Sequence, residues 1–173
     1  MLRSILVLTL LAGCSSITPI LDYTPEYIIY KDVVNTAQEY VGMDERKHRG
    51  ELRDFMGVDP YRIEWCAAFV NSVLNNSGIS GSESVSNHPL TARSFLNWGE
   101  KVEGEPMTGD VIVFPRGRYG WQGHVGFYID TVLINDIEYY IILGGNQSDK
   151  VSYEYYRSST AIDIRRVSIE NDA

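Results

Sequence analysis

Residues 110–129 read DVIVFPRGRYGWQGHVGFYI, and this stretch decides the fold class. Its two ends are rich in β-branched and aromatic residues and its middle is rich in glycine, a pattern that predicts two strands joined by a loop. Similar runs follow, so the expected strands are Asp110 to Phe114, Val125 to Ile129, Tyr139 to Leu143, Val151 to Tyr156 and Ala161 to Val167. Connections as short as Asn135-Asp136 suit hairpins better than crossovers, so we expect an antiparallel sheet.

The chain before Pro106 has the spacing of helices instead. Thr24 is a predicted N-cap ahead of Pro25, and apolar positions continue a helical face to Gly42. The other expected helices run from about Glu51 to Met56, from Cys66 to Asn76, and from about His88-Pro89 to near Trp98-Gly99. This order predicts an α+β fold in which N-terminal helices pack on a C-terminal antiparallel sheet.

Length and composition are those of one globular domain. The chain has 173 residues, of which 44% are hydrophobic and 22% are charged, so we expect a single domain over residues 24–173. We expect it to be a monomer. The formal net charge of −8 argues against a surface that binds phosphates, which makes nucleic acid a poor partner. Two cysteines exclude a four-cysteine zinc site and no cluster has metal-ligand spacing, so we expect no metal and no cofactor.

The N-terminus has the pattern of a secretion signal. Arg3 precedes an apolar run from Ile5 to Leu11, which is far shorter than the roughly 18 residues that a membrane-spanning helix needs. No later segment approaches that length, so an integral membrane protein is not expected.

The end of this run, Leu11-Ala12-Gly13-Cys14, resembles the lipobox of bacterial lipoproteins. The resemblance implies a signal peptide over residues 1–13, acylation of Cys14, and a tether over residues 14–23 that holds the protein on a membrane. Ser15 after the cysteine resembles the sorting signal for the outer membrane, with the protein facing the periplasm. The alternative is an ordinary cleaved signal with an incidental cysteine.

Cys66 is the candidate nucleophile, because it begins the predicted central helix. Amide groups and the dipole at a helix N-terminus favour a thiolate over a thiol, so we expect a lowered pKa and fast alkylation. The alternative is a small buried side chain beside Ala67, Ala68 and Phe69.

His124 is the best candidate for a general base among the three histidines. His48 lies in a charged surface run, and His88 precedes a proline that favours extended backbone. His124 begins a predicted strand between two glycines, and alternation places it on the opposite face from Val125 and Phe127. A structural role is the alternative.

A third polar group is needed to orient the imidazole. Asn146 follows the strand that pairs with the strand of His124, so it is the predicted orienting residue, with Gln147 as the substitute. An asparagine after two glycines is also an ordinary turn signal.

Four motifs in order are similar to those of NlpC- and CHAP-type cell-wall hydrolases, a papain-like superfamily of bacteria and phages. The motifs are EWCAAFVN at 64–71, GDVIVF at 109–114, GHVGF at 123–127 and GGNQS at 144–148. The resemblance covers roughly residues 25–168 and implies a papain-like α+β core and cleavage of amide bonds in peptidoglycan. Carried over by position, Cys66 becomes the nucleophile, His124 the base and Asn146 the third residue. Many CHAP members have a glutamate where this chain has Gly144.

The loop from Pro115 to Gln122 is a candidate wall of a substrate site, since it combines arginines with aromatic residues just before His124. Its possible substrate contacts are Arg118 and Trp121, and Trp65 and Gln147 are possible contacts from elsewhere. The alternative is a solvated loop with one anchoring aromatic residue.

The sequence thus predicts a lipid-anchored cysteine amidase or peptidase that acts on peptidoglycan. A non-catalytic lipoprotein that binds peptidoglycan or a partner protein, and an acyl-transfer enzyme on the same scaffold, are the competing hypotheses.

Overall fold

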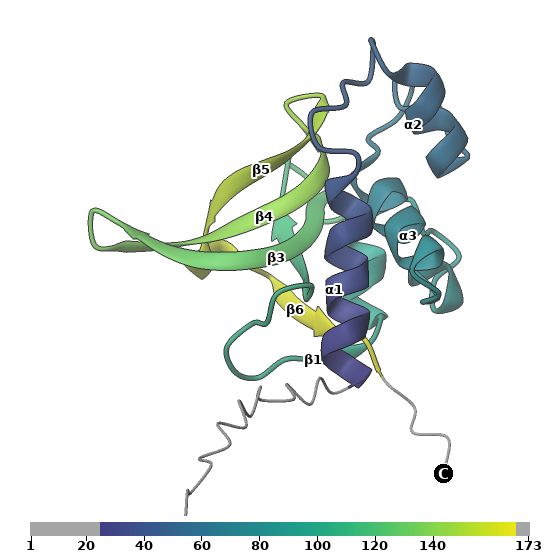
Figure 1. The fold of residues 1–173 in the computed structure, drawn as a ribbon. Coiled ribbons are helices and arrows are strands. Elements are labelled where there is room, and N and C mark those ends of the chain that lie inside the picture. The colour runs from purple at the N-terminus through teal and green to yellow at the C-terminus, as the bar shows by residue number, and fades with distance from the viewer. Residues whose placement is uncertain (1–24, 169–173) are drawn as a thin grey trace, which may run out of the picture.

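The computed structural model describes residues 25–168. Its sheet has six strands, each pair antiparallel, in the order β1-β6-β2-β3-β4-β5 (Figure 1). The strands are β1 (Glu100–Lys101), β2 (Val111–Pro115), β3 (Gly123–Ile134), β4 (Ile137–Gln147), β5 (Lys150–Arg157) and β6 (Asp163–Arg166). The prediction of an α+β fold with an antiparallel sheet is therefore confirmed.

Strands β3 and β4 are longer than the sequence predicts and form a hairpin that projects from the sheet (Figure 1). Asn135 and Asp136 form its turn with φ of 51° and 61°. Positive φ at both central residues is what a two-residue hairpin turn requires, because such a turn matches the twist of the strands. The expected hairpin at this position is confirmed.

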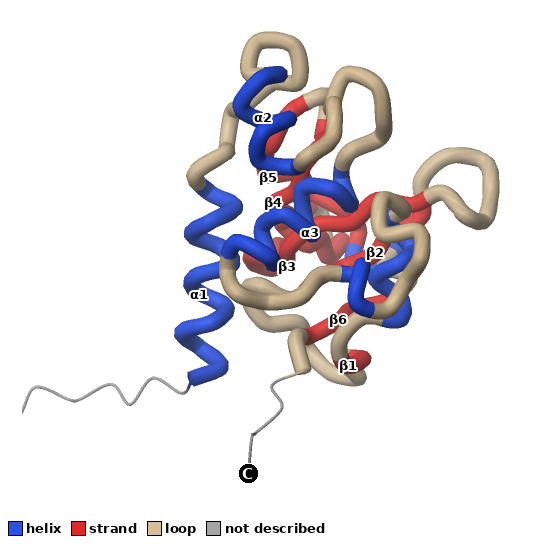
Figure 2. The backbone as a smooth tube through the Cα atoms, turned by 90° about the vertical axis from the view of Figure 1, so that its right-hand side faces the viewer, coloured by secondary structure: helices blue, strands red, loops and turns tan. Residues whose placement is uncertain are grey.

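Three helices, α1 (Pro25–Gln38), α2 (Arg49–Met56) and α3 (Cys66–Asn76), lie on one side of the sheet (Figures 1 and 2). Helix α3 has the predicted bounds. Helix α1 ends at Gln38 rather than continuing to Gly42, because the Gly42 N–H donates to the Val151 carbonyl, which ties this segment to β5. The helix expected before Trp98 is a 3₁₀ helix, and the three 3₁₀ helices are Ser82–Ser84, Ala92–Asn97 and Ser158–Thr160.

The main core lies between α3 and the sheet. Phe69, Val70 and Val73 of α3 are fully buried against a face of the sheet that includes Val125 and Phe127. Burial of each such side chain contributes about 1.5 to 3 kcal/mol. Five residues form a second cluster: Ile112, Phe114, Tyr128, Tyr140 and Ile142. The two faces of β3 thus carry different neighbours, as its alternation predicts.

Gly145 lets α3 approach β4 closely. A Cβ atom there would lie 2.6 Å from atoms of both Phe69 and Trp65. Real Cβ atoms do not come that close to other heavy atoms, so a larger residue would push the helix from the sheet. This contact brings the N-terminal end of α3 beside the end of β4.

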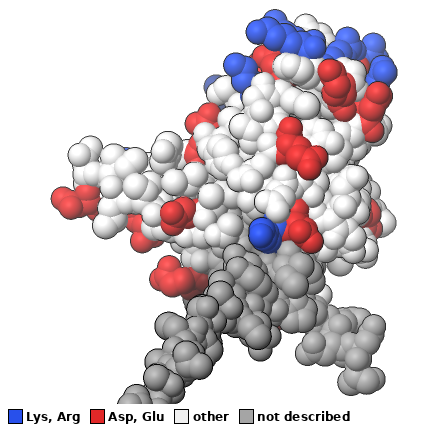
Figure 3. Space-filling view, viewed as in Figure 1, with Lys and Arg blue, Asp and Glu red and all other residues white. Residues whose placement is uncertain are grey.

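Lysine and arginine side chains gather around α2 in the view of Figure 3. Several are paired, since Arg49 and Arg62 contact Asp59, and Arg53 contacts Asp54. This surface is therefore a mixture of charges rather than an open basic patch.

The predicted signal peptide over residues 1–13, Cys14, the tether over 14–23 and the N-cap Thr24 lie outside the described residues. Among the helices that are described, none is long and apolar enough to cross a membrane.

Candidate active site

Cys66 is the first residue of α3 and is only 3% exposed. Burial raises the pKa of its thiol, the opposite of the direction that the sequence predicts. Hydrogen bonds from the backbone of Val125 and Ala67, and the positive charge of Arg116, act in the other direction without reversing the shift. Position at a helix N-terminus is therefore not enough to produce a thiolate here. The contact with Val125 brings the sulfur beside the residue that follows His124.

His124 lies near the start of β3 and is 1% exposed. Its ring stacks on Tyr156 of β5, with centroids 5.3 Å apart. The pKa of His124 is lowered to about 4, mainly by burial; the Gln147 hydrogen bond acts in the opposite direction and the Arg116 charge in the same direction as burial. The imidazole is neutral at pH 7.

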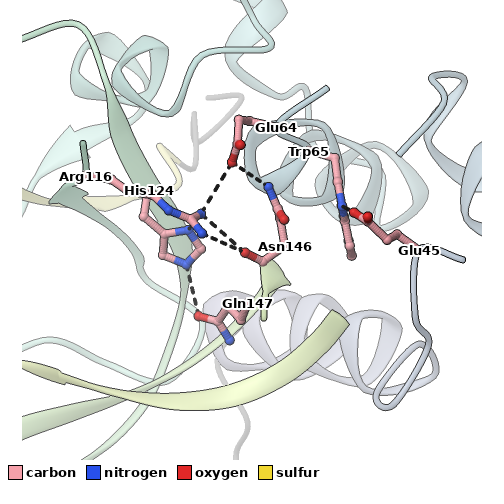
Figure 4. Close-up of polar contacts among 7 residues, drawn as sticks. All are labelled: Glu45, Glu64, Trp65, Arg116, His124, Asn146 and Gln147. Atoms are coloured by element: carbon pink, nitrogen blue, oxygen red, sulfur yellow. Dashed lines mark hydrogen bonds and ion pairs between the residues drawn. The ribbon is translucent and has the colours of Figure 1, made fainter. Parts of the chain in front are cut away.

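Gln147 of β4 is the residue that orients His124. The Gln147 Oε1 atom lies 2.9 Å from His124 Nε2 (Figure 4). The Gln147 Nε2 atom donates to the carbonyl oxygens of Ile142 and Ser152, which only accept hydrogen bonds, so the orientation of the amide is settled. Therefore Nε2 of His124 carries the proton and donates to Gln147, and Nδ1 keeps the lone pair.

Asn146, the predicted orienting residue, does not contact the imidazole with its side chain. Its Nδ2 atom instead donates to Glu64 Oε2 over 2.8 Å (Figure 4). Pairing of β4 with β5 is irregular between Gly144 and Gln147, and Asn146 has a φ of 56°. This irregularity changes which side chain faces His124, so the substitute that the sequence names, Gln147, takes the contact.

Arg116 is the site residue that sequence reasoning missed. Its Nη1 atom donates to His124 Nδ1 over 3.3 Å, and Nη1 and Nη2 both donate to the Asn146 carbonyl over 3.2 Å (Figure 4). A weaker ion pair of 3.8 Å joins it to Glu64. The position of Arg116 follows from the register of the sheet: Phe114 pairs with His124, and a residue two positions later faces the same side.

Two cavities meet at Arg116. One of about 260 Å³ is lined by Cys66, Arg116, Trp121 and Gln122 among others. The second, of about 300 Å³, is lined by Arg116, His124, Gln147 and Tyr156 among others. The residues predicted for chemistry therefore lie around one guanidinium group.

The predicted substrate contacts have different positions. Trp121 is 66% exposed and lines the cavity of Cys66, which suits a substrate contact. Arg118 lies on the same loop but outside the lining of that cavity. Trp65 is fully buried against Phe69, and its indole N–H donates to Glu45, so in this structure its side chain is not open to a substrate. Its aromatic ring supports α3 instead.

The other histidines have local contacts. His48 Nδ1 accepts a hydrogen bond from the backbone N–H of Asp44, and His88 is exposed in a loop. Within residues 25–168, no group of three or more His, Cys, Asp or Glu side chains is placed to hold a metal ion.

Comparison with known protein families agrees with the motifs and the fold. The sequence matches the CHAP domain over residues 58–146, a range that contains Cys66, His124 and Asn146 and ends one residue before Gln147. Comparison with curated proteins finds no match. The matched range is more than half of the chain and includes α3, β2, β3 and all of β4 except its last residue. The chain therefore belongs to the CHAP domain family.

Proposed function

We propose that this protein is a cysteine amidase or peptidase that hydrolyses amide bonds in the stem peptides of peptidoglycan. Membership of the CHAP family supports peptidoglycan hydrolysis as the class of activity. The observation that carries the cysteine mechanism is the hydrogen bond from His124 Nε2 to Gln147, on the strand whose next residue, Val125, donates a backbone hydrogen bond to the thiol of Cys66. It leaves the lone pair of the imidazole on Nδ1, where a base needs it.

The reaction begins when Nδ1 of His124 takes the proton of Cys66. The thiolate then attacks the carbonyl carbon of the substrate amide, and the imidazolium returns the proton to the leaving amine. Water, activated by the same nitrogen, hydrolyses the resulting thioester and restores the thiol. Gln147 keeps the proton on Nε2 and the ring in position throughout.

Both groups are neutral in the resting site, because burial raises the pKa of Cys66 and lowers the pKa of His124. Proton transfer from sulfur to nitrogen therefore belongs to the step in which substrate is bound. Polar groups of the bound substrate therefore have to favour the thiolate and the imidazolium, because burial by itself disfavours both charges.

Digestion of purified sacculi, followed by mass spectrometry of the released muropeptides, tests this proposal. Wild-type protein should release peptides, whereas folded Cys66→Ala and Cys66→Ser variants should lose activity by orders of magnitude, since a hydroxyl is a much weaker nucleophile than a thiolate. A folded Cys66→Ala variant that releases the same peptides would show that Cys66 is not the nucleophile. Binding of wild-type protein to sacculi without release would instead support a non-catalytic binding protein.

Acceptor experiments separate hydrolysis from acyl transfer. Products that carry an added amine, formed in place of the free acid, would identify an acyl-transfer enzyme on this scaffold. Hydrolysis in ¹⁸O-water should place one heavy oxygen in the new carboxylate.

We also propose that Cys14 is acylated and that it anchors the protein to the outer membrane, facing the periplasm. The support is the sequence Leu11-Ala12-Gly13-Cys14 after a short apolar run. Peptidoglycan lies within reach of a protein tethered there.

A further inference from the structure

Arg116 occupies the nitrogen that the proposed mechanism uses as the base. The amide of Gln147 leaves the lone pair of His124 on Nδ1, and Arg116 Nη1 donates a hydrogen bond to that atom over 3.3 Å. A nitrogen that accepts a hydrogen bond from a guanidinium cannot at the same time accept the proton of Cys66. The resting site is therefore blocked at its base.

The contacts that hold Arg116 there are weak enough to exchange. They are long hydrogen bonds to a ring nitrogen and to the carbonyl of Asn146, and a 3.8 Å ion pair with Glu64. The side chains of Arg116 and Glu64 are 42% and 80% exposed, so water weakens that ion pair. A carboxylate that accepts two parallel hydrogen bonds is a better partner for a guanidinium than any of these contacts.

A substrate at Cys66 has access to Arg116. Both residues line the cavity of about 260 Å³ that also contains Trp121. A peptide whose carbonyl carbon lies at the sulfur therefore presents its neighbouring groups to the guanidinium. Arg118, the other arginine of this loop, does not line the cavity.

We propose that Arg116 determines specificity, by binding a free carboxylate of the substrate close to the amide that is cleaved and thereby leaving Nδ1 of His124. The inference rests on the proposed function, because it concerns the substrate of that same site. In this sequence of events, Arg116 keeps its proton, Cys66 passes its proton to Nδ1, and the Nε2 proton stays shared with Gln147. Departure of the cation removes a charge that disfavours the imidazolium, and it also removes a charge that favours the thiolate, so the main effect of the exchange is to free Nδ1.

The other groups around His124 do not supply such an exchange. Tyr156 stacks on its ring, Glu154 lines the same cavity, and Gln147 is held by two carbonyl groups. Glu64 is linked to the ring only through Arg116, and Cys66 is the proton donor. Among these groups, Arg116 is the one that can exchange its contact with His124 for a contact with a substrate carboxylate.

A matched pair of peptide substrates tests this inference. Both peptides contain the bond that the sacculus digestion identifies, and they differ only in a free carboxylate or a carboxamide next to that bond. For wild-type protein, kcat/KM should be roughly 10- to 100-fold higher for the carboxylate peptide, the range for a charge-assisted pair of hydrogen bonds. For Arg116→Gln the two values should agree within about threefold.

Three further variants make the comparison specific. Arg116→Lys should keep a reduced preference, because a lysine supplies the charge without the two parallel hydrogen bonds. It also replaces Arg116→Gln if that variant does not fold. Arg53→Gln removes an equally charged residue from α2 and should keep the full wild-type preference. Loss of preference in Arg118→Gln, with retention in Arg116→Gln, would assign the carboxylate to the other arginine and overturn the proposal.

Failure of this inference differs from failure of the proposed function. Wild-type protein that cleaves both peptides equally well would overturn the role of Arg116 and leave the hydrolase proposal intact. Protein that cleaves neither sacculi nor peptides would contradict the hydrolase proposal itself.

A spectroscopic measurement checks the blocked nitrogen directly. In ¹⁵N-labelled Cys66→Ala protein, addition of the carboxylate peptide should change the chemical shift of His124 Nδ1 and raise the pKa of this histidine, as Arg116→Gln should without peptide. The carboxamide peptide should produce neither change. A response that is identical for the two peptides would contradict the exchange.

Discussion

At the scale of single residues, the site depends on the orientation of the Gln147 amide beside His124. Gln147 acts through the direction of its amide, because two carbonyl groups hold Nε2 and leave Oε1 for His124. An amide in this place supplies no charge. Its contribution is the choice of tautomer and the position of the ring.

Gln147→Leu should therefore lower kcat/KM by roughly 100-fold or more, because the leucine cannot hold the Nε2 proton in place. Asn146→Gly is the matched control, since glycine tolerates the φ of 56° at this position and removes only the side-chain bond to Glu64. Asn146→Gly should lower kcat/KM by less than about tenfold. Rates of muropeptide release, measured at equal folded fraction, compare the two. A larger loss in Asn146→Gly would return the orienting role to Asn146.

Alkylation of Cys66 in the absence of substrate should be slow at pH 7. Burial raises the pKa of the thiol, so the rate should rise with pH through a midpoint above the ordinary cysteine value of about 8.5. The rate of labelling by iodoacetamide between pH 6 and pH 10 measures this midpoint. Rapid labelling at pH 6 would instead support the thiolate that the position at the start of α3 predicts.

His124 should make the folded protein less stable as the pH falls. Its pKa is about 4 when folded and 6.5 in its ordinary state, so the unfolded chain binds the proton more readily. Above about pH 7 the histidine does not change the free energy of unfolding. As the pH falls to about 4, it lowers this free energy by about 3 kcal/mol. Urea unfolding of wild type and His124→Gln at several pH values isolates this effect from that of the carboxyl groups. As the pH falls, wild type should therefore lose more stability than His124→Gln, and the extra loss should equal the effect given above for His124. A difference that does not change with pH would contradict the low pKa.

At the scale of elements, the site exists because α3 and β4 touch at Gly145. The helix carries Cys66 at its first residue, and the strand carries Gln147 at its last. Glu64 bonds Asn146 across the same junction. Close contact of helix and strand therefore sets the distance between Cys66 and Gln147.

Gly145→Ala should destabilise the protein by roughly 1 to 3 kcal/mol, because its Cβ would overlap Trp65 and Phe69. Gly104→Ala is the control, since nothing lies within 4 Å of its Cβ position, and it should change stability by less than about 0.5 kcal/mol. Thermal and urea unfolding measure both. Equal stability of the two variants would show that α3 moves away from β4 without cost.

At the scale of the whole molecule, the sheet separates two environments. One face packs on α3 and forms the larger core, and the other holds the cluster of Phe114 and Tyr140. Cys66 belongs to the first environment, whereas His124 stacks on Tyr156, which packs against the second. The cavity lined by Cys66 and the cavity lined by His124 share Arg116, which follows the end of β2.

Cys14→Ser should release the protein from the membrane fraction or leave an unprocessed precursor, because serine has no thiol that can form the thioether bond to the lipid. Fractionation of cells and the mass of the N-terminal peptide measure this outcome. The catalytic domain should keep its activity on sacculi after extraction. Membrane association of a fully processed mutant would contradict lipid anchoring through Cys14.

Local sequence pattern accounts for most of the helices and strands, though not for all of their bounds, and for the positions of Cys66 and His124 within them. The periodicity of α3 identifies its bounds, since apolar spacing and the terminal Ser77-Gly78 are properties of adjacent residues. Alternation in β3 likewise predicts that His124 and Val125 face opposite sides. Both predictions agree with the structure because they depend only on backbone geometry within one helix or strand.

The remaining features depend on contacts between distant segments. Gln147 replaces Asn146 beside His124 because β4 is irregular where it pairs with β5, and no pattern within GGNQS reveals that irregularity. Trp65 is buried, and the pKa of Cys66 is raised, because α3 packs against strands that lie far from it in the chain. Arg116 reaches both Glu64 and Asn146 for the same reason. Burial and long-range contacts are set by the packing of all elements together, so these parts of the site follow only from the tertiary structure.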